Sequence, residues 1–318
     1  MSDEHKQDES AAHDHHGHDH GASGHTHAPK NFGAAFAIGT ALNFGFVIVE
    51  VVFGLYAHSL ALVADAGHNM GDVLGLLLAW GASALARRAP TQRHTYGMQS
   101  SSILAALFNA IFLLVSVGAI AWEAIRRFGN PTEVAGWTVI WVSAVGIAIN
   151  TATALMFMSG RKGDLNIRGA FMHMAADAGI SAGVVIAGFL ILATGLHWID
   201  PVVSLAISAV IIWGTWGLLR DSVNLALQAV PEGIELAVVK EYLAGLPHVT
   251  AVHDLHIWPM STTETALTAH LVRDVDRCDS SVLEKCCKEL HDKFEIQHAT
   301  IQFETEDHDC GLAPESRV

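Results

Sequence analysis

Two His–Asp pairs lie inside long apolar segments of the sequence. His68 and Asp72 occur in ADAGHNMGDVL, and His173 and Asp177 repeat the same spacing in MHMAADAGISAG. Residues four apart on a helix lie on one face, so each pair presents an imidazole nitrogen and a carboxylate to the same point. Zn²⁺ binds four such ligands tetrahedrally, and ionisable groups at membrane depth usually mark an ion path. The two pairs together predict an intramembrane site for a divalent metal.

Composition predicts a membrane protein with charged ends. Hydrophobic residues make up 51% of the 318 residues and charged residues 16%, well below the roughly 25% of soluble domains. The net charge of −14 comes almost wholly from the two ends of the chain. This distribution argues against a nucleic-acid partner and favours segments that attract cations. The four cysteines all lie near the carboxyl end and suit a reducing compartment rather than disulfides: Cys278, Cys286, Cys287 and Cys310.

Six apolar segments have the roughly 20 residues that a helix needs to cross a membrane. They run approximately over 32–56, 60–86, 100–124, 136–158, 168–194 and 200–219. Lys and Arg are more frequent in the loops on the side of the termini, which places both termini in the cytoplasm of a multi-pass protein surrounded by membrane lipid. We expect the membrane to be a bacterial inner (cell) membrane. In this topology the second and fifth segments run in opposite directions, and both His–Asp pairs fall near the midplane.

Other polar residues in these segments have ordinary alternatives. A single intramembrane His or Asp is often a hydrogen-bonding group between helices, but two pairs at matched depth disfavour that interpretation. Asp65 lies three residues before His68 and either extends the metal path outward or interacts with the helix dipole. Glu50 is a costly carboxylate in this position unless it is protonated, paired or in contact with water.

The two ends of the chain have different compositions from the membrane region, residues 32–222. Residues 1–31 contain eight His and predict a disordered tail, which either collects metal or is a solvated tail with no specific role. Residues 223–318 predict the order αββαβ, a cytosolic ferredoxin-like α+β domain. Side chains alternate along a strand, so His298 and Glu304 share a face and could join His253 and His270 at a second metal site; surface histidines would give the same pattern.

The sequence resembles the cation diffusion facilitators, in particular their zinc-transporter branch. The resemblance depends on SLALVADAGHNMGD, HMAADAGISAGVV, VHDLHIW, AHLV and HATIQFE. It implies a homodimeric exchanger that moves Zn²⁺ out of the cytosol against protons, with the two His–Asp pairs as the transport site. It also implies a regulatory metal site in the cytosolic domain at His253, His270 and His298. Some members have a further site between the second and third segments, but that loop here reads PTQRHTYGMQ and retains only His94.

Three classes of function fit an intramembrane metal site. A metalloenzyme keeps an open position for water, whereas four protein ligands leave none and the sequence has no HExxH motif; we therefore do not expect an enzyme. A passive cation channel or a metal sensor remains an alternative to a transporter. We expect proton-coupled efflux of Zn²⁺, with Co²⁺ and Cd²⁺ as alternative substrates, because metal and protons compete for the same ligand atoms.

Overall fold

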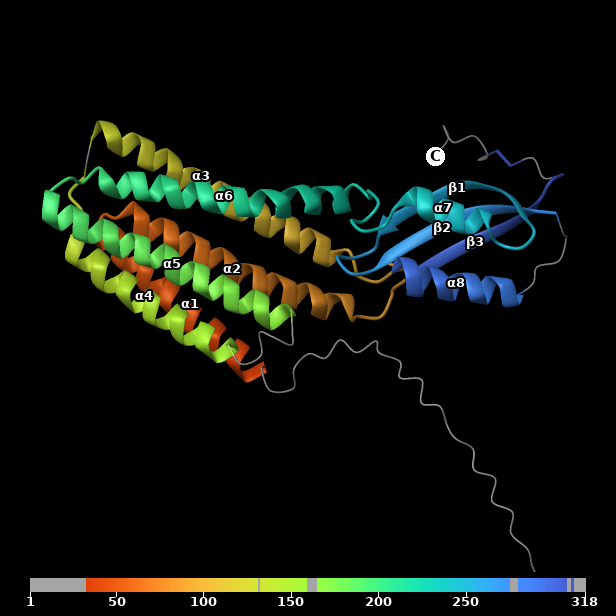
Figure 1. Cartoon of the computed structure of the whole chain (residues 1–318), viewed down its shortest axis with the longest axis horizontal. Helices are drawn as coiled ribbons and strands as arrows, with labels where there is room; N and C mark the ends of the chain where they lie inside the picture. Colours follow the sequence, from red (N-terminus) through yellow and green to blue (C-terminus); the bar gives the residue numbers. More distant parts are fainter. Residues whose placement is uncertain (1–32, 131, 159–164, 275–279, 308–309, 312–318) are drawn as a thin grey trace, which may run out of the picture.

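A membrane bundle and a smaller C-terminal domain make up the protein (Figure 1). The structure is a computed structural model and describes residues 33–130, 132–158, 165–274, 280–307 and 310–311. The predicted tail, residues 1–31, lies outside the described residues. The bundle consists of α1 (Gly33–Tyr56), α2 (Leu60–Ala86), α3 (Ser101–Gly129), α4 (Gly136–Phe157), α5 (Leu165–Thr194) and α6 (Ile199–Ala226).

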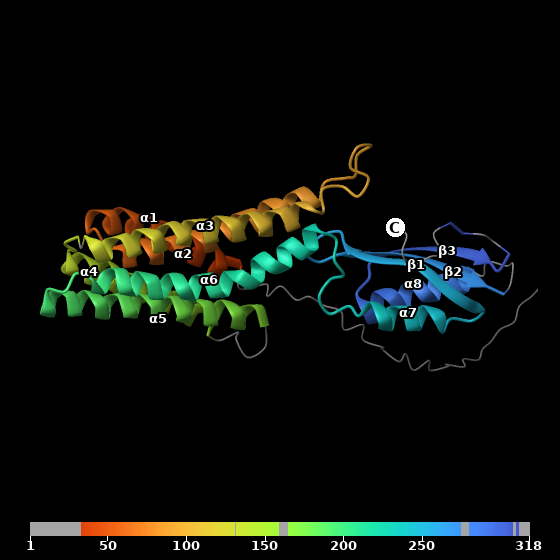
Figure 2. The ribbon, with the colours of Figure 1, turned by 90° about the horizontal axis from the view of Figure 1, so that it is seen from above.

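All six helices are long and apolar enough to cross a membrane, which confirms the predicted α-helical membrane fold. The helices α3 and α6 extend several residues beyond the predicted segments, so Arg126 and Arg127 lie in the last turn of α3 rather than in a loop. Charged groups at a helix end can reach the membrane surface along their flexible stems. We call the side of the bundle that holds the C-terminal domain the domain side, and the opposite side, where α1 ends and α2 begins, the far side (Figure 2).

The start of α2 is fixed by a carboxylate from another helix. Asp200 of α6 is 1% exposed, and its oxygens accept hydrogen bonds from Ser59 Oγ at 2.5 Å, Leu60 N at 2.7 Å and Ala61 N at 3.3 Å. The first N–H groups of a helix have no partner within it and attract negative charge. Asp200 therefore caps α2 and ties its far-side end to α6, which holds the helix that carries His68 and Asp72 in place.

We expect Asp200→Ala to lower the free energy of unfolding by about 2 kcal/mol, because buried donors at the start of α2 lose their acceptor. Thermal unfolding of the purified protein in detergent measures the change. The control is Asp221→Ala, which removes an exposed carboxylate from the same helix and should leave the unfolding temperature unchanged. Equal stability of the two variants would show that the cap does not hold α2.

The C-terminal domain contains α7 (Leu236–Ala244), β1 (Val249–Pro259), β2 (Thr265–Arg273), α8 (Ser280–Phe294) and β3 (His298–Thr305), the predicted αββαβ order. The strands form one sheet in the order β1-β2-β3. The hairpin β1–β2 is antiparallel, whereas β2 and β3 are parallel, because the chain crosses over through α8 between them. Both helices pack on one face of the sheet around a core that includes Leu243, Leu267 and Leu290 (Figure 2).

The β1–β2 hairpin contacts the domain-side end of the bundle. Ser100 Oγ donates to Met260 O at 3.1 Å, and Thr262 N donates to Ser102 Oγ at 3.1 Å. These bonds join the turn between β1 and β2 to the start of α3. The C-terminal domain is thus attached to the helix bundle through side chains as well as through the chain after α6.

Candidate functional site

The two His–Asp pairs meet inside the bundle. The helices α2 and α5 contact each other, with α2 beginning on the far side and α5 on the domain side. His68 lies about 12 Å along α2 from Leu60, and His173 lies about 12 Å along α5 from Leu165, at 1.5 Å per residue. Both pairs therefore reach a similar depth from opposite ends, as their positions in the sequence predicted.

Each imidazole lies near both carboxylates. His68 Nε2 is 3.8 Å from Asp72 Oδ2 and 3.3 Å from Asp177 Oδ1. His173 Nε2 is 3.2 Å from Asp72 Oδ2 and 3.6 Å from Asp177 Oδ2. The two rings meet edge to face with centroids 5.9 Å apart. Ligand atoms of His68, Asp72 and His173 lie within 4.8 Å of one another, and the buried Asp177 lies beside both imidazoles through a different oxygen for each.

These separations match a compact tetrahedral ion. Metal–ligand bonds of 2.0–2.2 Å place tetrahedral ligand atoms about 3.3–3.6 Å apart, and the four nitrogen–oxygen distances range from 3.2 to 3.8 Å. The oxygens of Asp177 have no hydrogen-bond donor among the described residues although the residue is 0% exposed. A buried carboxylate of this kind is stable only with a cation or a protonated imidazole beside it.

A cavity leads to this point from the domain side. It has a volume of about 580 Å³. Its lining includes Thr40 near the start of α1, Phe157 at the end of α4, Ala170 near the start of α5, and both Asp72 and His173. Because these helix ends lie on the domain side, the cavity gives an ion access to Asp72 and His173 from that side.

The far side of the site is packed with buried polar groups. Asp65 accepts a hydrogen bond from Ser181 Oγ at 3.0 Å, and Glu50 accepts one from Asn69 Nδ2 at 3.0 Å. All four side chains are 0% exposed. In this structure Asp65 therefore belongs to the closed far side, and the site opens toward the domain side.

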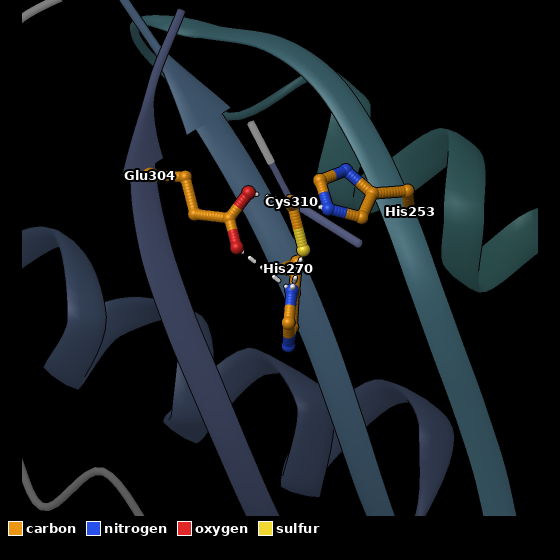
Figure 3. Close-up of side chains that lie close together, drawn as sticks. All are labelled: His253, His270, Glu304 and Cys310. Carbon is orange, nitrogen blue, oxygen red and sulfur yellow. Dashed lines mark hydrogen bonds and ion pairs between the residues drawn. The ribbon is translucent and has the colours of Figure 1, made fainter. Parts of the chain in front are cut away.

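A second group of metal-binding side chains lies on the sheet of the C-terminal domain (Figure 3). Ligand atoms of His253, His270, Glu304 and Cys310 lie within 4.8 Å of one another. His253 Nε2 is 3.2 Å from Glu304 Oε2, and His270 Nδ1 is 2.8 Å from Glu304 Oε1. Cys310 Sγ is 3.6 Å from His270 Nδ1. Nitrogen, oxygen and sulfur ligands in this number fit a structural Zn²⁺ site.

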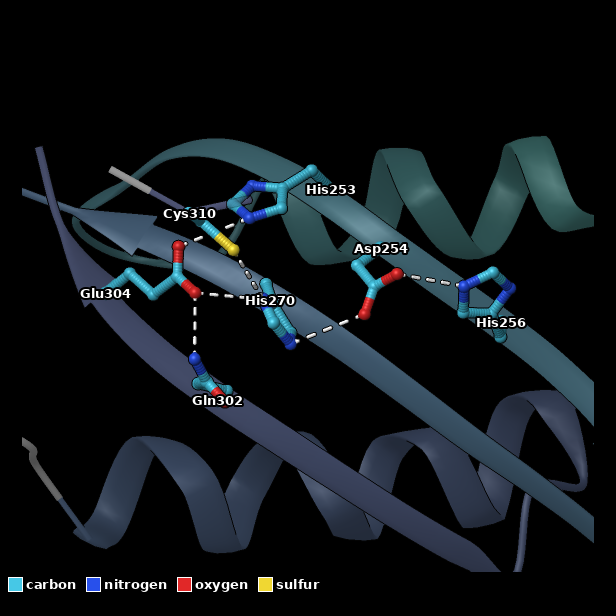
Figure 4. A network of polar contacts seen from close by, with 7 residues as sticks. All are labelled: His253, Asp254, His256, His270, Gln302, Glu304 and Cys310. Carbon is cyan, nitrogen blue, oxygen red and sulfur yellow. Dashed lines mark hydrogen bonds and ion pairs between the residues drawn. The ribbon is translucent and has the colours of Figure 1, made fainter. Parts of the chain in front are cut away.

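Outer carboxylate and imidazole groups orient this cluster (Figure 4). Asp254 Oδ2 is 3.4 Å from His270 Nε2, the ring nitrogen that faces away from Glu304, and Asp254 Oδ1 is 2.9 Å from His256 Nε2. A carboxylate on the second nitrogen fixes the ring and its tautomer when the first nitrogen binds metal. Asp254 reaches His270 because β1 is irregular between His253 and His256, with Asp254 at φ 48°.

The structure does not bring His298 into the cluster, which corrects the predicted set of ligands. His298 pairs with Ala266 and Glu304 pairs with Val272, so six residues of strand, about 20 Å, separate the two. The His298 ring instead packs against Tyr96 from the loop between α2 and α3, with centroids 5.4 Å apart. Sharing a face of a strand places residues on one side of the sheet but not at one point.

Cys310 lies where a fourth ligand of this cluster would be, and only its place in the sequence hints at this. Its thiol lies near two histidines, whereas burial raises the pKa of the Cys286 thiol, which lies on the buried face of α8, to about 11. A raised pKa keeps a thiol protonated and unable to bind metal. The position of Cys310 in the run EDHDC, after the strand that ends at Thr305, was the only hint that this cysteine differs from Cys286.

The chain belongs to the cation efflux family of membrane transporters. The pattern described as the cation efflux transmembrane domain matches residues 36–225, and the one described as the cation efflux protein, cytoplasmic domain, matches residues 231–306. This confirms the resemblance to the cation diffusion facilitators. The family and its members are metal cation transporters, so the protein is an integral membrane transporter and not an enzyme.

Named relatives include several bacterial transporters of zinc, cadmium and cobalt. The chain is 36% identical over 294 residues to the zinc transporter ZitB of Escherichia coli, covering 91% of this chain and 92% of that protein. It is 36% identical over 284 residues to the metal cation efflux system protein CzcD of Cupriavidus metallidurans, covering 89% and 90%. A cadmium, cobalt and zinc/H(+)-K(+) antiporter of Bacillus subtilis is 34% identical over 269 residues, covering 83% and 86%.

Proposed function

We propose that the protein exports Zn²⁺ from the cytosol in exchange for protons, by alternating access to a transport site formed by His68, Asp72, His173 and Asp177. The observation that carries this proposal is that both imidazoles lie within 3.8 Å of both carboxylates, at a place that a cavity about 580 Å³ in volume reaches through Asp72 and His173. A site within a membrane bundle that is reached from one side is what a carrier requires, since an open channel would be reached from both.

Proton exchange follows from charge and from ligand chemistry. Moving two positive charges against an inside-negative potential costs about 4.6 kcal/mol per 100 mV, so export needs a compensating inward charge. Metal binding requires neutral imidazoles and ionised carboxylates, and protons compete for the same atoms. His68 and His173 are the groups that take up a proton on the outer side and release it when metal arrives from the cytosol.

The same proposal places the C-terminal domain in the cytoplasm, together with both termini, in a bacterial inner membrane. Arg87, Arg88 and Arg93 follow α2 on the domain side, whereas the far side has Arg126 and Arg127 at the end of α3. The excess of positive charge on the domain side supports this orientation. We also propose a homodimer, which the cytoplasmic domains of this family suggest, and a regulatory metal at His253, His270, Glu304 and Cys310.

Sealed vesicles that contain the purified protein provide the test. A proton gradient imposed across the vesicle membrane, with no other energy source, should drive accumulation of Zn²⁺ and dissipate the gradient as Zn²⁺ moves. Movement of Zn²⁺ that follows only its own gradient would indicate a channel. Binding without movement would indicate a sensor.

Deleting residues 2–28, which removes all eight His of the tail, should raise the Zn²⁺ concentration for half-maximal transport by about two- to threefold. Flexible His clusters collect metal weakly by composition, and the transport site is built without them. The maximal rate should stay within about 30% of that of the full chain. Vesicle uptake over a range of Zn²⁺ concentrations gives both quantities, and a complete loss of transport would contradict this role of the tail.

His270→Ala should remove one bound Zn²⁺ per protomer, because His270 lies 2.8 Å from Glu304 and 3.6 Å from Cys310. The number of ions bound is measured by equilibrium dialysis on protein that lacks residues 2–28. The matched control is His291→Ala, an exposed histidine on α8, which should bind as much Zn²⁺ as the parent. Unchanged binding in His270→Ala would rule out this site.

A further inference from the structure

Two carboxyl groups lie about one helical turn beyond the transport site toward the far side. Asp65 is about 8 Å along α2 from its first residue, and Glu50 is about 9 Å along α1 from its last residue, at 1.5 Å per residue. Both side chains are 0% exposed. Burial of two carboxyl groups in the membrane region is costly, and the transport site does not use either of them.

Each carboxyl group has one oxygen with a neutral donor and one oxygen without a donor. Asn69 Nδ2 donates to Glu50 Oε2 at 3.0 Å, and Ser181 Oγ donates to Asp65 Oδ2 at 3.0 Å. The other two oxygens, Oε1 of Glu50 and Oδ1 of Asp65, receive no hydrogen bond within the described part of the chain. Asn69, which donates to Glu50, lies one turn after Asp65 on the same face of α2, so the two carboxyl groups are neighbours. A hydrogen bond between two carboxyl groups requires a proton on one of them.

The charged groups around Glu50 and Asp65 also indicate that one of the two carboxyl groups carries a proton. His68 of α2 and Asp177 of α5 are titratable groups near enough to influence the pair electrostatically, and within the described residues no Lys or Arg forms an ion pair with either carboxyl group. Two adjacent carboxylates in a buried site repel each other, so such pairs hold one proton between them. We propose that Glu50 and Asp65 share one proton and form a second proton-carrying site of the exchanger.

This inference rests on the proposed Zn²⁺/proton exchange and adds a second proton to it. A divalent ion at the transport site brings two positive charges to within about one turn of Asp65, which favours the ionised pair. The shared proton then leaves through the cavity into the cytosol. After the metal has left on the outer side, the pair takes up a proton there. One proton on the histidines and one on this pair balance the two charges of the metal, so the exchange is electrically neutral.

The proton count on metal binding tests the pair directly. Purified protein in weakly buffered detergent solution is titrated with Zn²⁺ near pH 7, and a pH indicator measures the protons released per protomer. Glu50→Gln and Asp65→Asn keep the shape of the side chains but cannot share the proton. Each should release about one proton fewer than the natural protein, and the double variant should also release about one fewer, not two, because one proton belongs to both groups.

Glu123→Gln is the matched control, because Glu123 is a half-exposed carboxylate on α3 that pairs with Arg126. It should release as many protons as the natural protein. Protons that Zn²⁺ releases from the tail and the C-terminal domain are the same in all variants, because all variants share those sites. They therefore cancel when the proton count of a variant is compared with that of the natural protein. The Zn²⁺ affinity from the same titration shows that each variant is folded, and Asp65→Asn gives the count should Glu50→Gln fail to fold.

A vesicle measurement checks the consequence for transport. With two protons per metal, an imposed membrane potential should not change Zn²⁺ accumulation by the natural protein, whereas Glu50→Gln should become sensitive to it. Equal proton counts in Glu50→Gln and the natural protein, with Zn²⁺ binding intact, would overturn this inference alone. An absence of Zn²⁺/proton exchange in the natural protein would instead overturn the proposed function. A K⁺ dependence of Zn²⁺ transport that the natural protein shows and Glu50→Gln lacks would assign the pair to a metal cation and also overturn the inference.

Discussion

Asp72→Ala and Asp177→Ala are each expected to lower Zn²⁺ transport by at least about 100-fold while leaving the protein folded and inserted. Each carboxylate lies within 3.8 Å of both imidazoles, so its loss removes one of four ligands and also the negative charge that balances the ion. Loss of groups that only support metal ligands costs about 10- to 100-fold, and loss of a ligand costs more. Proton-driven uptake in vesicles measures the effect.

Asp221→Ala provides the control for these variants. It makes the same substitution at an exposed position of α6 that lies outside the transport site, and it should transport Zn²⁺ at the natural rate. Thermal unfolding in detergent verifies that Asp72→Ala and Asp177→Ala remain folded. Normal uptake by a folded Asp72→Ala protein would show that the metal does not pass through this site.

His68→Asp is expected to raise Cd²⁺ transport relative to Zn²⁺ by about tenfold, which equals about 1.4 kcal/mol of differential binding. The natural site has two imidazoles and two carboxylates at spacings that suit a compact tetrahedral ion. No cysteine lies in α1 to α6, so no soft ligand favours the larger and softer Cd²⁺. A shorter carboxylate in place of the imidazole can bind through two oxygens and accept longer bonds.

The two ions are measured together in the same vesicles, so that differences in protein amount cancel. His94→Asp is the matched control, since it introduces the same residue at an exposed position of the loop after α2, and its Cd²⁺ to Zn²⁺ ratio should equal that of the natural protein. An unchanged ratio in His68→Asp would mean that groups outside the four ligands decide which ion is carried.

The sequence by itself determined the membrane fold and predicted the four residues of the proposed transport site. Six apolar segments define six helices because the hydrocarbon core sets their length and requires their backbone groups to bond internally. His68 and Asp72 lie on one face because a helix repeats every 3.6 residues. Both properties are local, so they can be derived from composition and spacing, and the short distances between α2 and α5 agree with them.

Only the tertiary structure decided which residues gather in the C-terminal domain. Alternation along β3 places His298 and Glu304 on one side of the sheet, but the register with β2 puts Glu304 beside the end that carries His270 and leaves His298 near Tyr96. The irregularity in β1 that turns Asp254 toward His270 also breaks the simple alternation. Register and irregular strands depend on pairing between distant segments, and spacing within one segment does not contain them.

Glu50 and Asp65, the buried carboxyl pair, also separate what the sequence determined from what the tertiary structure decided. Apolar neighbours in the sequence mark Glu50 as unusual and leave three possible explanations: protonation, pairing or contact with water. Its 0% exposure separates it from bulk water, and its position beside Asn69 and Asp65 of α2 favours pairing and a shared proton. That contact exists because α1 and α2 pack against each other, and the packing of two helices is a property of the folded bundle, not of either segment alone.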